Sequence, residues 1–213
     1  YRTHGGAVLA EQKETEGPAK AKPAFVRAEE KNLVGYIASQ LVKDRDIIFL
    51  GTGSTCTQMA GHLKEKSGLT VVTNNVSAAL ELSDARDISV ILTGGILQSS
   101  MEMVSVSGEF TLKMLEGIRV SISFLGVSGV DMNFGYSVSS MEEAKLWQAV
   151  RELSEMTVVV CDSSKFTKKS LVKVGDLDCV SRVVTDQKVP DNFKEYYYQA
   201  GIPLYTSYEL DAG

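Results

Sequence analysis

The sequence has few cysteines and prolines and no long apolar run. Its three cysteines, Cys56, Cys161 and Cys179, lack the spacing of metal ligands, and we expect them to be reduced thiols of a cytoplasmic protein. No apolar segment approaches the roughly 20 residues of a membrane span, and no signal-peptide pattern opens the chain. We therefore expect neither a membrane protein nor a metal or other cofactor.

Concentrated positive charge is also missing. The chain has 22 lysines and arginines against 27 aspartates and glutamates, for a net charge of -5. A duplex-binding domain usually carries a basic face, because neutralising phosphates supplies much of its affinity. We therefore expect that this chain does not itself contact DNA.

The composition is that of one globular domain with terminal extensions. Of the 213 residues, 44% are hydrophobic and 23% are charged, which is enough to bury a core. The chain opens on Tyr1 rather than Met, so we expect a processed protein or a fragment. Residues 10–23 are polar and free of aromatic side chains, and they are predicted to be a linker. The globular domain is predicted to span residues 24–213.

Within that domain, short apolar runs alternate with segments of helical periodicity. Strands are predicted at 47–50, 70–72, 88–92, 120–125, 157–160, 180–184 and 202–205. Helices are predicted at 25–43, 55–66, 76–82, 110–116 and 141–153 and after Pro190. The run at 47–50 is predicted to be covered on both faces. This alternation predicts an α/β fold, a layered and mostly parallel sheet flanked by helices.

The loop after the first predicted strand has the character of a phosphate site. It reads Gly51, Thr52, Gly53, Ser54 and Thr55 and leads directly into a helix. Small residues allow the backbone to approach an anion, and the helix N-terminus adds N–H donors and a positive dipole end. It is neither a Walker A loop nor GxGxxG. The alternative is a tight turn with a Ser or Thr cap.

Other predicted strands end in similar polar loops. These loops are residues 73–75, 93–95, 126–131 and 162–166. Ligands of such sheets bind beyond the carboxyl ends of the strands. Asp131 and Asp162 suit sugar hydroxyls and Lys165 suits a phosphate, so the pattern predicts a small phosphorylated ligand. Asp131 and Lys165 could instead form a structural ion pair.

The same segments resemble the DeoR family of transcriptional repressors across nearly the whole chain. The resemblance is carried by 51–55, Thr73-Asn74, Gly94-Gly95, 126–131 and, most specifically, the DSSKF run at 162–166. The stretch at 2–7 is similar to the end of the family's winged helix-turn-helix, so residues 1–9 are expected to be its remnant.

The resemblance implies a C-terminal effector-sensing domain with the fold of ribose-5-phosphate isomerase and glucosamine-6-phosphate deaminase. It implies a phosphorylated sugar or related metabolite as effector, DNA contact only through an N-terminal winged domain absent from this chain, and a homodimer or homotetramer. The ligand residues it implies are Thr52, Gly53, Ser54, Thr55, Thr73, Asn74, Gly94, Asp131 and Lys165. The chain departs from the family in having Leu50-Gly51 where an Asp often begins the first loop.

Two other functions stay open. An isomerase-like enzyme would show Asp-Glu and a Lys-Gly-Gly-Gly run, but Asp131 is followed by Met132, and the histidines are only His4 and His62. We therefore expect no enzyme activity. A module that only holds subunits together is the other alternative, and the aromatic stretch at 193–198 could be an oligomer contact or ordinary helix core.

Overall fold

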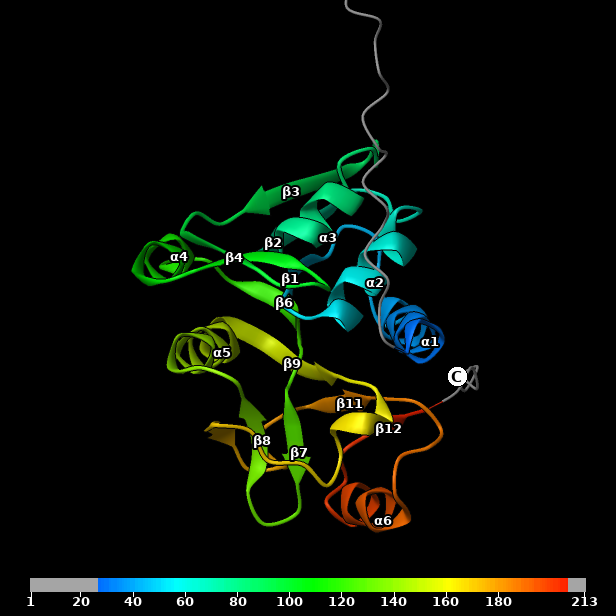
Figure 1. Cartoon of the computed structure of the whole chain (residues 1–213). Helices are drawn as coiled ribbons and strands as arrows, with labels where there is room; N and C mark the ends of the chain where they lie inside the picture. The colour runs from blue at the N-terminus through cyan, green and yellow to red at the C-terminus, as the bar shows by residue number, and fades with distance from the viewer. Residues whose placement is uncertain (1–26, 207–213) are drawn as a thin grey trace, which may run out of the picture.

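The computed structural model describes residues 27–206 (Figure 1). The predicted segments 1–9 and 10–23 lie outside the described residues, as do the start of the predicted helix 25–43 and the last residues of the predicted domain. No helix of residues 27–206 is long and apolar enough to cross a membrane.

The centre of the fold is one seven-stranded sheet in which every neighbouring pair of strands is parallel. From one edge to the other, the strands are β12 (Leu204–Tyr205), β11 (Arg182–Val184), β9 (Ser154–Val160), β6 (Val120–Leu125), β1 (Ile47–Leu50), β2 (Leu69–Thr73) and β3 (Ile88–Leu92). The predicted α/β fold with a mostly parallel sheet is confirmed.

Helices cover both faces of this sheet. They are α1 (Ala28–Ser39), α2 (Ser54–Leu63), α3 (Val76–Glu81), α4 (Glu109–Leu115), α5 (Met141–Leu153) and α6 (Asp191–Gln199). Buried residues of α1–α3 pack on one face and those of α4–α6 on the other.

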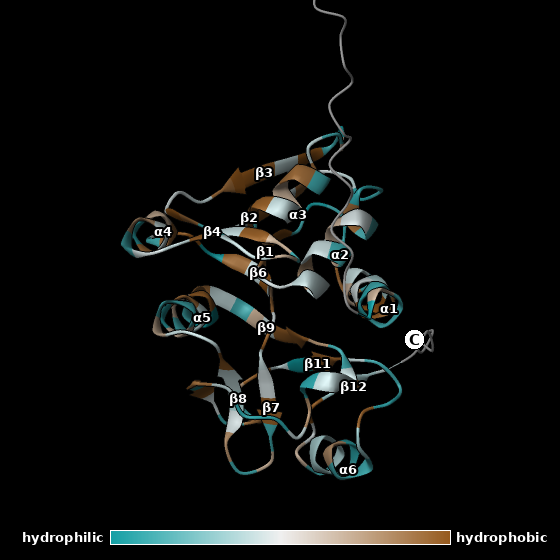
Figure 2. Ribbon diagram, in the orientation of Figure 1, coloured by the Kyte–Doolittle hydropathy of each residue, from teal (hydrophilic) through white to brown (hydrophobic). Residues whose placement is uncertain are grey.

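Successive side chains of a strand point to opposite faces, and this explains the apolar runs. In β1, Ile48 and Leu50 join the cluster under α1–α3, whereas Phe49 joins the other cluster. Figure 2 shows the apolar residues along β1 and β6. Ile47 is 45% exposed, so the prediction that the whole strand 47–50 is covered on both faces is wrong at its first residue.

Two small antiparallel units were not predicted. One is a hairpin of β4 (Ile96–Ser99) and β5 (Val104–Ser107), which we call the β4–β5 hairpin. The other is a sheet of β7 (Gly129–Asp131), β8 (Gly135–Val138) and β10 (Val172–Gly175). These strands have only three or four residues each, so even the alternation in β5 (VSVS) and β10 (VKVG) is too short to identify a strand by itself. The strand β4 is exposed throughout.

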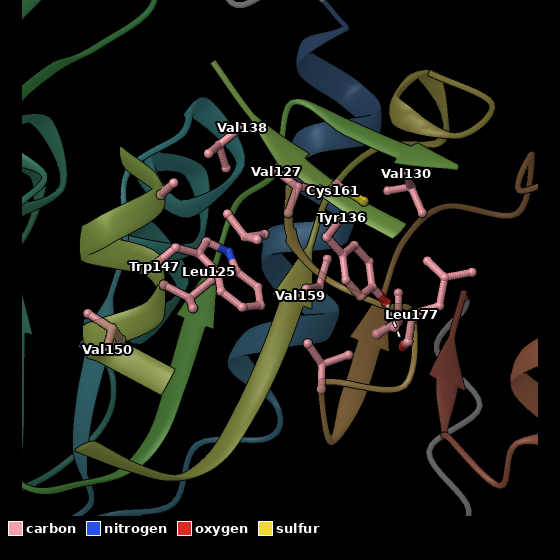
Figure 3. Packing of buried hydrophobic residues seen from close by; sticks show 14 of the residues in the cluster. Leu125, Val127, Val130, Tyr136, Val138, Trp147, Val150, Val159, Cys161 and Leu177 are labelled. Atoms are coloured by element: carbon pink, nitrogen blue, oxygen red, sulfur yellow. Dashed lines mark hydrogen bonds between the residues drawn. The ribbon is translucent and has the colours of Figure 1, made fainter. Parts of the chain in front are cut away.

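The core on the α5 side contains a buried pair of tyrosines. The Tyr136 and Tyr197 hydroxyl oxygens lie 2.8 Å apart. The Tyr136 hydroxyl also donates to the Leu177 carbonyl oxygen at 3.4 Å (Figure 3). The Tyr136 ring stacks on Trp147. Burial raises the pKa of Tyr136 well above its ordinary value. The pair therefore joins α6 to β8 and α5 through neutral, hydrogen-bonded phenols.

We expect Tyr197→Phe to lower the free energy of unfolding by about 1 kcal/mol, because it removes one buried hydrogen bond. Tyr198 is 88% exposed, and Tyr198→Phe is the matched control, with no expected change. Urea unfolding followed by circular dichroism measures both values. Equal stability of the two variants would contradict a structural role for the tyrosine pair.

Candidate functional site

A cavity of about 890 Å³ lies at the carboxyl ends of the central strands. The loops after β1, β6 and β9 line it, together with the β4–β5 hairpin and the N-terminus of α5. Five of the nine predicted ligand residues line it: Thr52, Gly53, Ser54, Thr55 and Lys165. Parallel strands end on the same side of a sheet, which is why loops far apart in sequence meet here.

The first loop presents the N-terminus of α2 to the cavity. Gly53 is the N-cap of this helix and has φ of 122°, a conformation that favours glycine. No side chain caps the helix, so the alternative of a turn with a Ser or Thr cap does not describe this loop. The first-turn N–H groups and the positive end of the helix dipole are suited to an anion.

The side chain of Asn75, which lies between β2 and α3, holds this loop in place through hydrogen bonds. Its Nδ2 donates to the carbonyl oxygens of Gly51 at 3.2 Å and Gly53 at 3.5 Å and to Thr57 Oγ1 at 3.0 Å. Its Oδ1 accepts the Ala78 N–H at 3.0 Å and so caps α3. One fully buried amide therefore sets the position of the first loop relative to α2 and α3.

The loop after β6 touches the first loop directly. A Cβ built on Gly126 would lie 2.7 Å from the Thr52 carbonyl oxygen, closer than real contacts allow. Upstream, the Gly51 N–H donates to the Phe124 carbonyl oxygen at 2.9 Å. Glycine at position 126 is therefore needed for the two loops to form one wall of the cavity.

Lys165 lies in the short 3-10 helix η1 (Ser163–Lys165), which follows β9. Two buried carboxylates hold this turn, because Asp162 accepts the Ser164 N–H at 2.9 Å and Asp186 accepts the Ser163 N–H at 2.6 Å. Lys165 is the single cation among the described residues that line the cavity. Asp162 supports Lys165 and does not itself line the cavity.

The β4–β5 hairpin supplies residues that the sequence did not reveal. Met103 Sδ accepts the Gly53 N–H at 2.9 Å, so a thioether occupies one donor of the first loop. The preceding residue, Glu102, also lines the cavity and forms an ion pair with Lys31 of α1 at 2.9 Å. The Lys31 side chain is only 6% exposed. The hairpin therefore connects the cavity to α1.

The N-terminus of α5 is a second helix end at the cavity. Ser140 is its N-cap and accepts the Glu143 N–H at 3.1 Å, and Glu143 accepts both the N–H and the hydroxyl of Ser139. Glu142 lines the cavity beside them. The start of this helix was predicted correctly at Met141, and Ser140 and Glu143 have the Ser-x-x-Glu spacing of a capping box. That this helix end lines the cavity was not predicted.

Three predicted ligand residues do not line the cavity and instead form hydrogen bonds to other parts of the chain. Thr73 Oγ1 donates to the Leu50 carbonyl oxygen, and Asn74 Nδ2 donates to the Val106 carbonyl oxygen at 2.9 Å. The Gly94 carbonyl oxygen accepts the Thr111 hydroxyl at 2.7 Å. None of the three lines the cavity in this conformation, and their contacts hold β1, β5 and α4 in place.

Asp131 also lies outside the cavity lining. Its Oδ1 accepts the N–H groups of Phe134 at 2.9 Å and Asn133 at 3.0 Å in the β7–β8 turn, and Lys169 Nζ lies 3.6 Å away. The Phe134 N–H, with smaller contributions from Asn133 and Lys169, lowers the pKa of Asp131. The ion partner of Asp131 is therefore Lys169, not Lys165 as one alternative had it.

Within residues 27–206, burial raises the pKa of all three cysteine thiols. Residues 27–206 contain no cluster of three or more His, Cys, Asp or Glu placed to hold a metal ion. Burial raises the pKa of Cys161, which lines the cavity, and raises that of Cys56 to about 12. His62 Nε2 lies 2.9 Å from Asn32 Oδ1 and does not line the cavity.

Comparison with known proteins gives the class of this fold and site. The chain is 37% identical over 185 residues to the HTH-type transcriptional regulator YulB of Bacillus subtilis, covering 87% of this chain and 70% of that protein. It is 30% identical over 189 residues to the glycerol-3-phosphate regulon repressor of Escherichia coli, covering 89% and 73%. The class is therefore that of transcriptional regulators.

The family follows from a match to the model of the DeoR C-terminal sensor domain over residues 26–187. The chain belongs to the DeoR family and comprises its C-terminal sensor domain. Among solved structures, ribose-5-phosphate isomerase A of Methanocaldococcus jannaschii is similar with a TM-score of 0.46 and 20% identity. That match covers 65% of this chain and about half, 54%, of the isomerase chain.

The role of Asn75 can be tested with two substitutions. We expect Asn75→Ala to lower the free energy of unfolding by about 1–3 kcal/mol, because both the α3 cap and the loop bonds are lost. Asn75→Asp keeps a cap acceptor but places a carboxylate against the Gly51 and Gly53 carbonyls. We expect the free energy of unfolding of Asn75→Asp also to be at least about 1 kcal/mol lower than that of the wild type. If Asn75→Asp were as stable as the wild type in denaturant unfolding, the hydrogen bonds to the loop would contribute nothing, and Asn75 would act only as the cap of α3.

Proposed function

We propose that this sensor domain binds a phosphorylated sugar or related metabolite in the cavity. The observation that carries the proposal is that the uncapped α2 N-terminus, with Thr52, Gly53, Ser54 and Thr55, lines the same cavity as Lys165. A helix N-terminus and a lysine together provide directed N–H donors and a compensating charge for a phosphate. The name of one relative, a glycerol-3-phosphate regulon repressor, agrees with a phosphorylated ligand.

The rest of the cavity suits the hydroxyls of a sugar. Glu102, Glu142 and Glu143 line it, and carboxylates accept hydrogen bonds from hydroxyl groups. They would repel a second phosphate, so we propose a ligand with one phosphate and several hydroxyls. Four other residues stay in the proposal, although they would reach the ligand only if the loops rearrange. They are Thr73, Asn74, Gly94 and Asp131.

We propose sensing without catalysis. Isomerisation of a sugar phosphate needs a base beside the carbonyl carbon. Glu143 accepts hydrogen bonds from Ser139 and Glu102 is paired with Lys31, while the buried Cys161 thiol has a raised pKa. Glu142 is the remaining carboxylate of the cavity, and the following assay tests whether it acts as such a base. Conversion of a bound sugar phosphate, followed by NMR of the ligand, would overturn this part of the proposal.

Binding would be signalled through α1. Residues 1–9 are proposed to be the end of a winged DNA-binding domain and residues 10–23 its linker, so α1 is the first element of the sensor domain after that linker. A ligand phosphate at the first loop would compete with Met103 for the Gly53 N–H, which would move the hairpin and strain the adjacent Glu102–Lys31 pair. The effector thereby alters DNA binding in the cytoplasm, to the extent that its affinity differs between the two conformations.

We expect thermal shift to identify the effector class. A ligand present at a hundredfold excess over its dissociation constant stabilises by about 2.7 kcal/mol. For a domain of this size that is a rise in Tm of about 5–10 °C. One sugar phosphate should exceed both its unphosphorylated parent and inorganic phosphate. A flat panel would contradict phosphate binding and favour a module that only assembles subunits.

Lys165→Ala separates a ligand role from a structural one. We expect it to weaken binding of that sugar phosphate by at least about tenfold, the loss of a charge-assisted hydrogen bond, with little change in Tm of the unliganded protein. The matched control is Lys169→Ala, which removes a nearby exposed lysine paired with Asp131 and should leave affinity unchanged. Equal affinity losses in the two variants, or loss of stability in Lys165→Ala, would contradict the assignment.

The signalling route predicts a variant that binds but does not respond. In the full-length regulator, wild-type operator affinity should change by about 5-fold or more when the effector binds. We expect Lys31→Met to keep effector affinity and lose most of that response. Lys188→Met is the control, because it breaks the other α1 ion pair, Lys188 to Glu30 at 2.9 Å, without reaching the cavity. A normal response in Lys31→Met, measured by fluorescence anisotropy of labelled operator, would rule out this route.

A further inference from the structure

The β4–β5 hairpin turns one face toward the cavity. Leu97 and Val106, in the middle of its two strands, do not line the cavity, whereas the residues on either side of them do. Successive side chains of a strand point to opposite sides, so the lining residues share one face of the hairpin. These uncharged residues of the two strands are Ile96, Gln98, Ser105 and Ser107.

Ser105 is the most deeply buried of these four residues. It is only 6% exposed, and because it lines the cavity, the surface that it keeps faces the cavity. Within residues 27–206 its hydroxyl has no hydrogen-bond partner. Buried polar groups nearly always have a partner, so this hydroxyl is free to bond a molecule in the cavity.

Gln98 lies directly across the hairpin from Ser105. It is exposed, and its side-chain amide likewise has no hydrogen-bond partner among the described residues. A carboxamide has both donors and an acceptor, and a serine hydroxyl can also donate and accept. The two side chains together therefore suit a group that donates and accepts, as a sugar hydroxyl does, whereas an ionised carboxylate can only accept.

The position of Ser105 relative to the first loop bears on the size of the ligand. Met103 accepts the Gly53 N–H, and Ser105 lies two residues further along the chain, about 7 Å away in an extended strand. The backbone of Ser105 is also bridged to Asn75, whose amide bonds Gly53. With a phosphate at the Gly53 N–H, this separation favours a sugar of five or six carbons over a three-carbon phosphate.

We propose that Gln98 and Ser105 are the specificity-determining residues of the effector site, and that they select a five- or six-carbon sugar phosphate by bonding a hydroxyl remote from the phosphate. The inference rests on the proposed function, because a phosphate held by the first loop and Lys165 fixes where the hydroxyls lie. A site that bonds a hydroxyl rejects ligands that lack it, because its own polar groups are then left unpaired.

Isothermal titration calorimetry of this chain measures the selectivity. The probes are inorganic phosphate, glycerol 3-phosphate, ribose 5-phosphate, glucose 6-phosphate, fructose 6-phosphate and fructose 1-phosphate. We expect the tightest sugar phosphate to bind at least about tenfold more tightly than glycerol 3-phosphate. Ser105→Ala and Gln98→Leu should each weaken that sugar phosphate by at least about tenfold and leave the affinities for glycerol 3-phosphate and inorganic phosphate unchanged.

Controls separate recognition of the ligand from support of the fold. Because the Ser105 hydroxyl has no partner in the described part of the chain, Ser105→Ala should not lower the Tm of the unliganded protein. Ser99→Ala changes a serine of β4 that does not line the cavity. Gln148→Leu changes an exposed glutamine of α5 that does not line it either. Both control variants should bind every probe as the wild type does.

Three outcomes would overturn this inference and leave the proposed function standing. The first is glycerol 3-phosphate binding as tightly as the tightest sugar phosphate. The second is an unchanged affinity for that sugar phosphate in either Ser105→Ala or Gln98→Leu. The third is an equal loss for the sugar phosphate and for inorganic phosphate, which would place the two residues at the phosphate or in the scaffold. If no phosphorylated probe binds the wild type, the proposed function fails and this inference fails with it.

Discussion

The buried side chain of Asn75 is the interaction on which the arrangement of the site depends. It donates to Gly51 and Gly53 on the loop after β1 and to Thr57 in α2, and it caps α3 with the same amide group. A loop built of small residues has little packing of its own, so its conformation must be imposed by its neighbours. Because Asn75 already holds this loop, the α2 N-terminus does not have to be ordered by a ligand, and this would lower the cost of binding the proposed phosphate.

The sequence predicted the central sheet because buried parallel strands leave a strong signal. The runs at 47–50 and 120–125 and the helix at 141–153 match the observed elements because most strand residues there pack under helices, and one stripe of the helix must be apolar. The apolar run at 88–92 also matches a strand, although β3 lies at the sheet edge and is largely exposed. The β4–β5 hairpin was missed for the opposite reason. Ile96–Ser99 is exposed along its whole length, and the pairing that makes it a strand is set by residues 104–107 rather than by its own pattern.

The sequence predicted which loops line the cavity better than which side chains do. Sequence order shows which residue follows a strand, and strand ends meet at one edge, so residues 52–55 and Lys165 line the same cavity, as expected. It does not show which way a side chain turns. Thr73 turns back to bond Leu50, and Asp131 is used by its own hairpin turn. Met103 reaches the first loop only through a hairpin that packs from outside the sheet, and no local pattern encodes such a contact.

The β4–β5 hairpin is the element where three parts of the molecule meet. Met103 contacts the first loop, Glu102 binds Lys31 of α1, and Ile96 lies against Gly108 at the start of α4. A partly buried ion pair such as Lys31–Glu102 is costly to break one side at a time, because the charge that remains is left without its partner. The hairpin and α1 should therefore move together or not at all. On the proposed function, a ligand that displaces Met103 would move the hairpin, and the Glu102–Lys31 ion pair would pass that movement to α1.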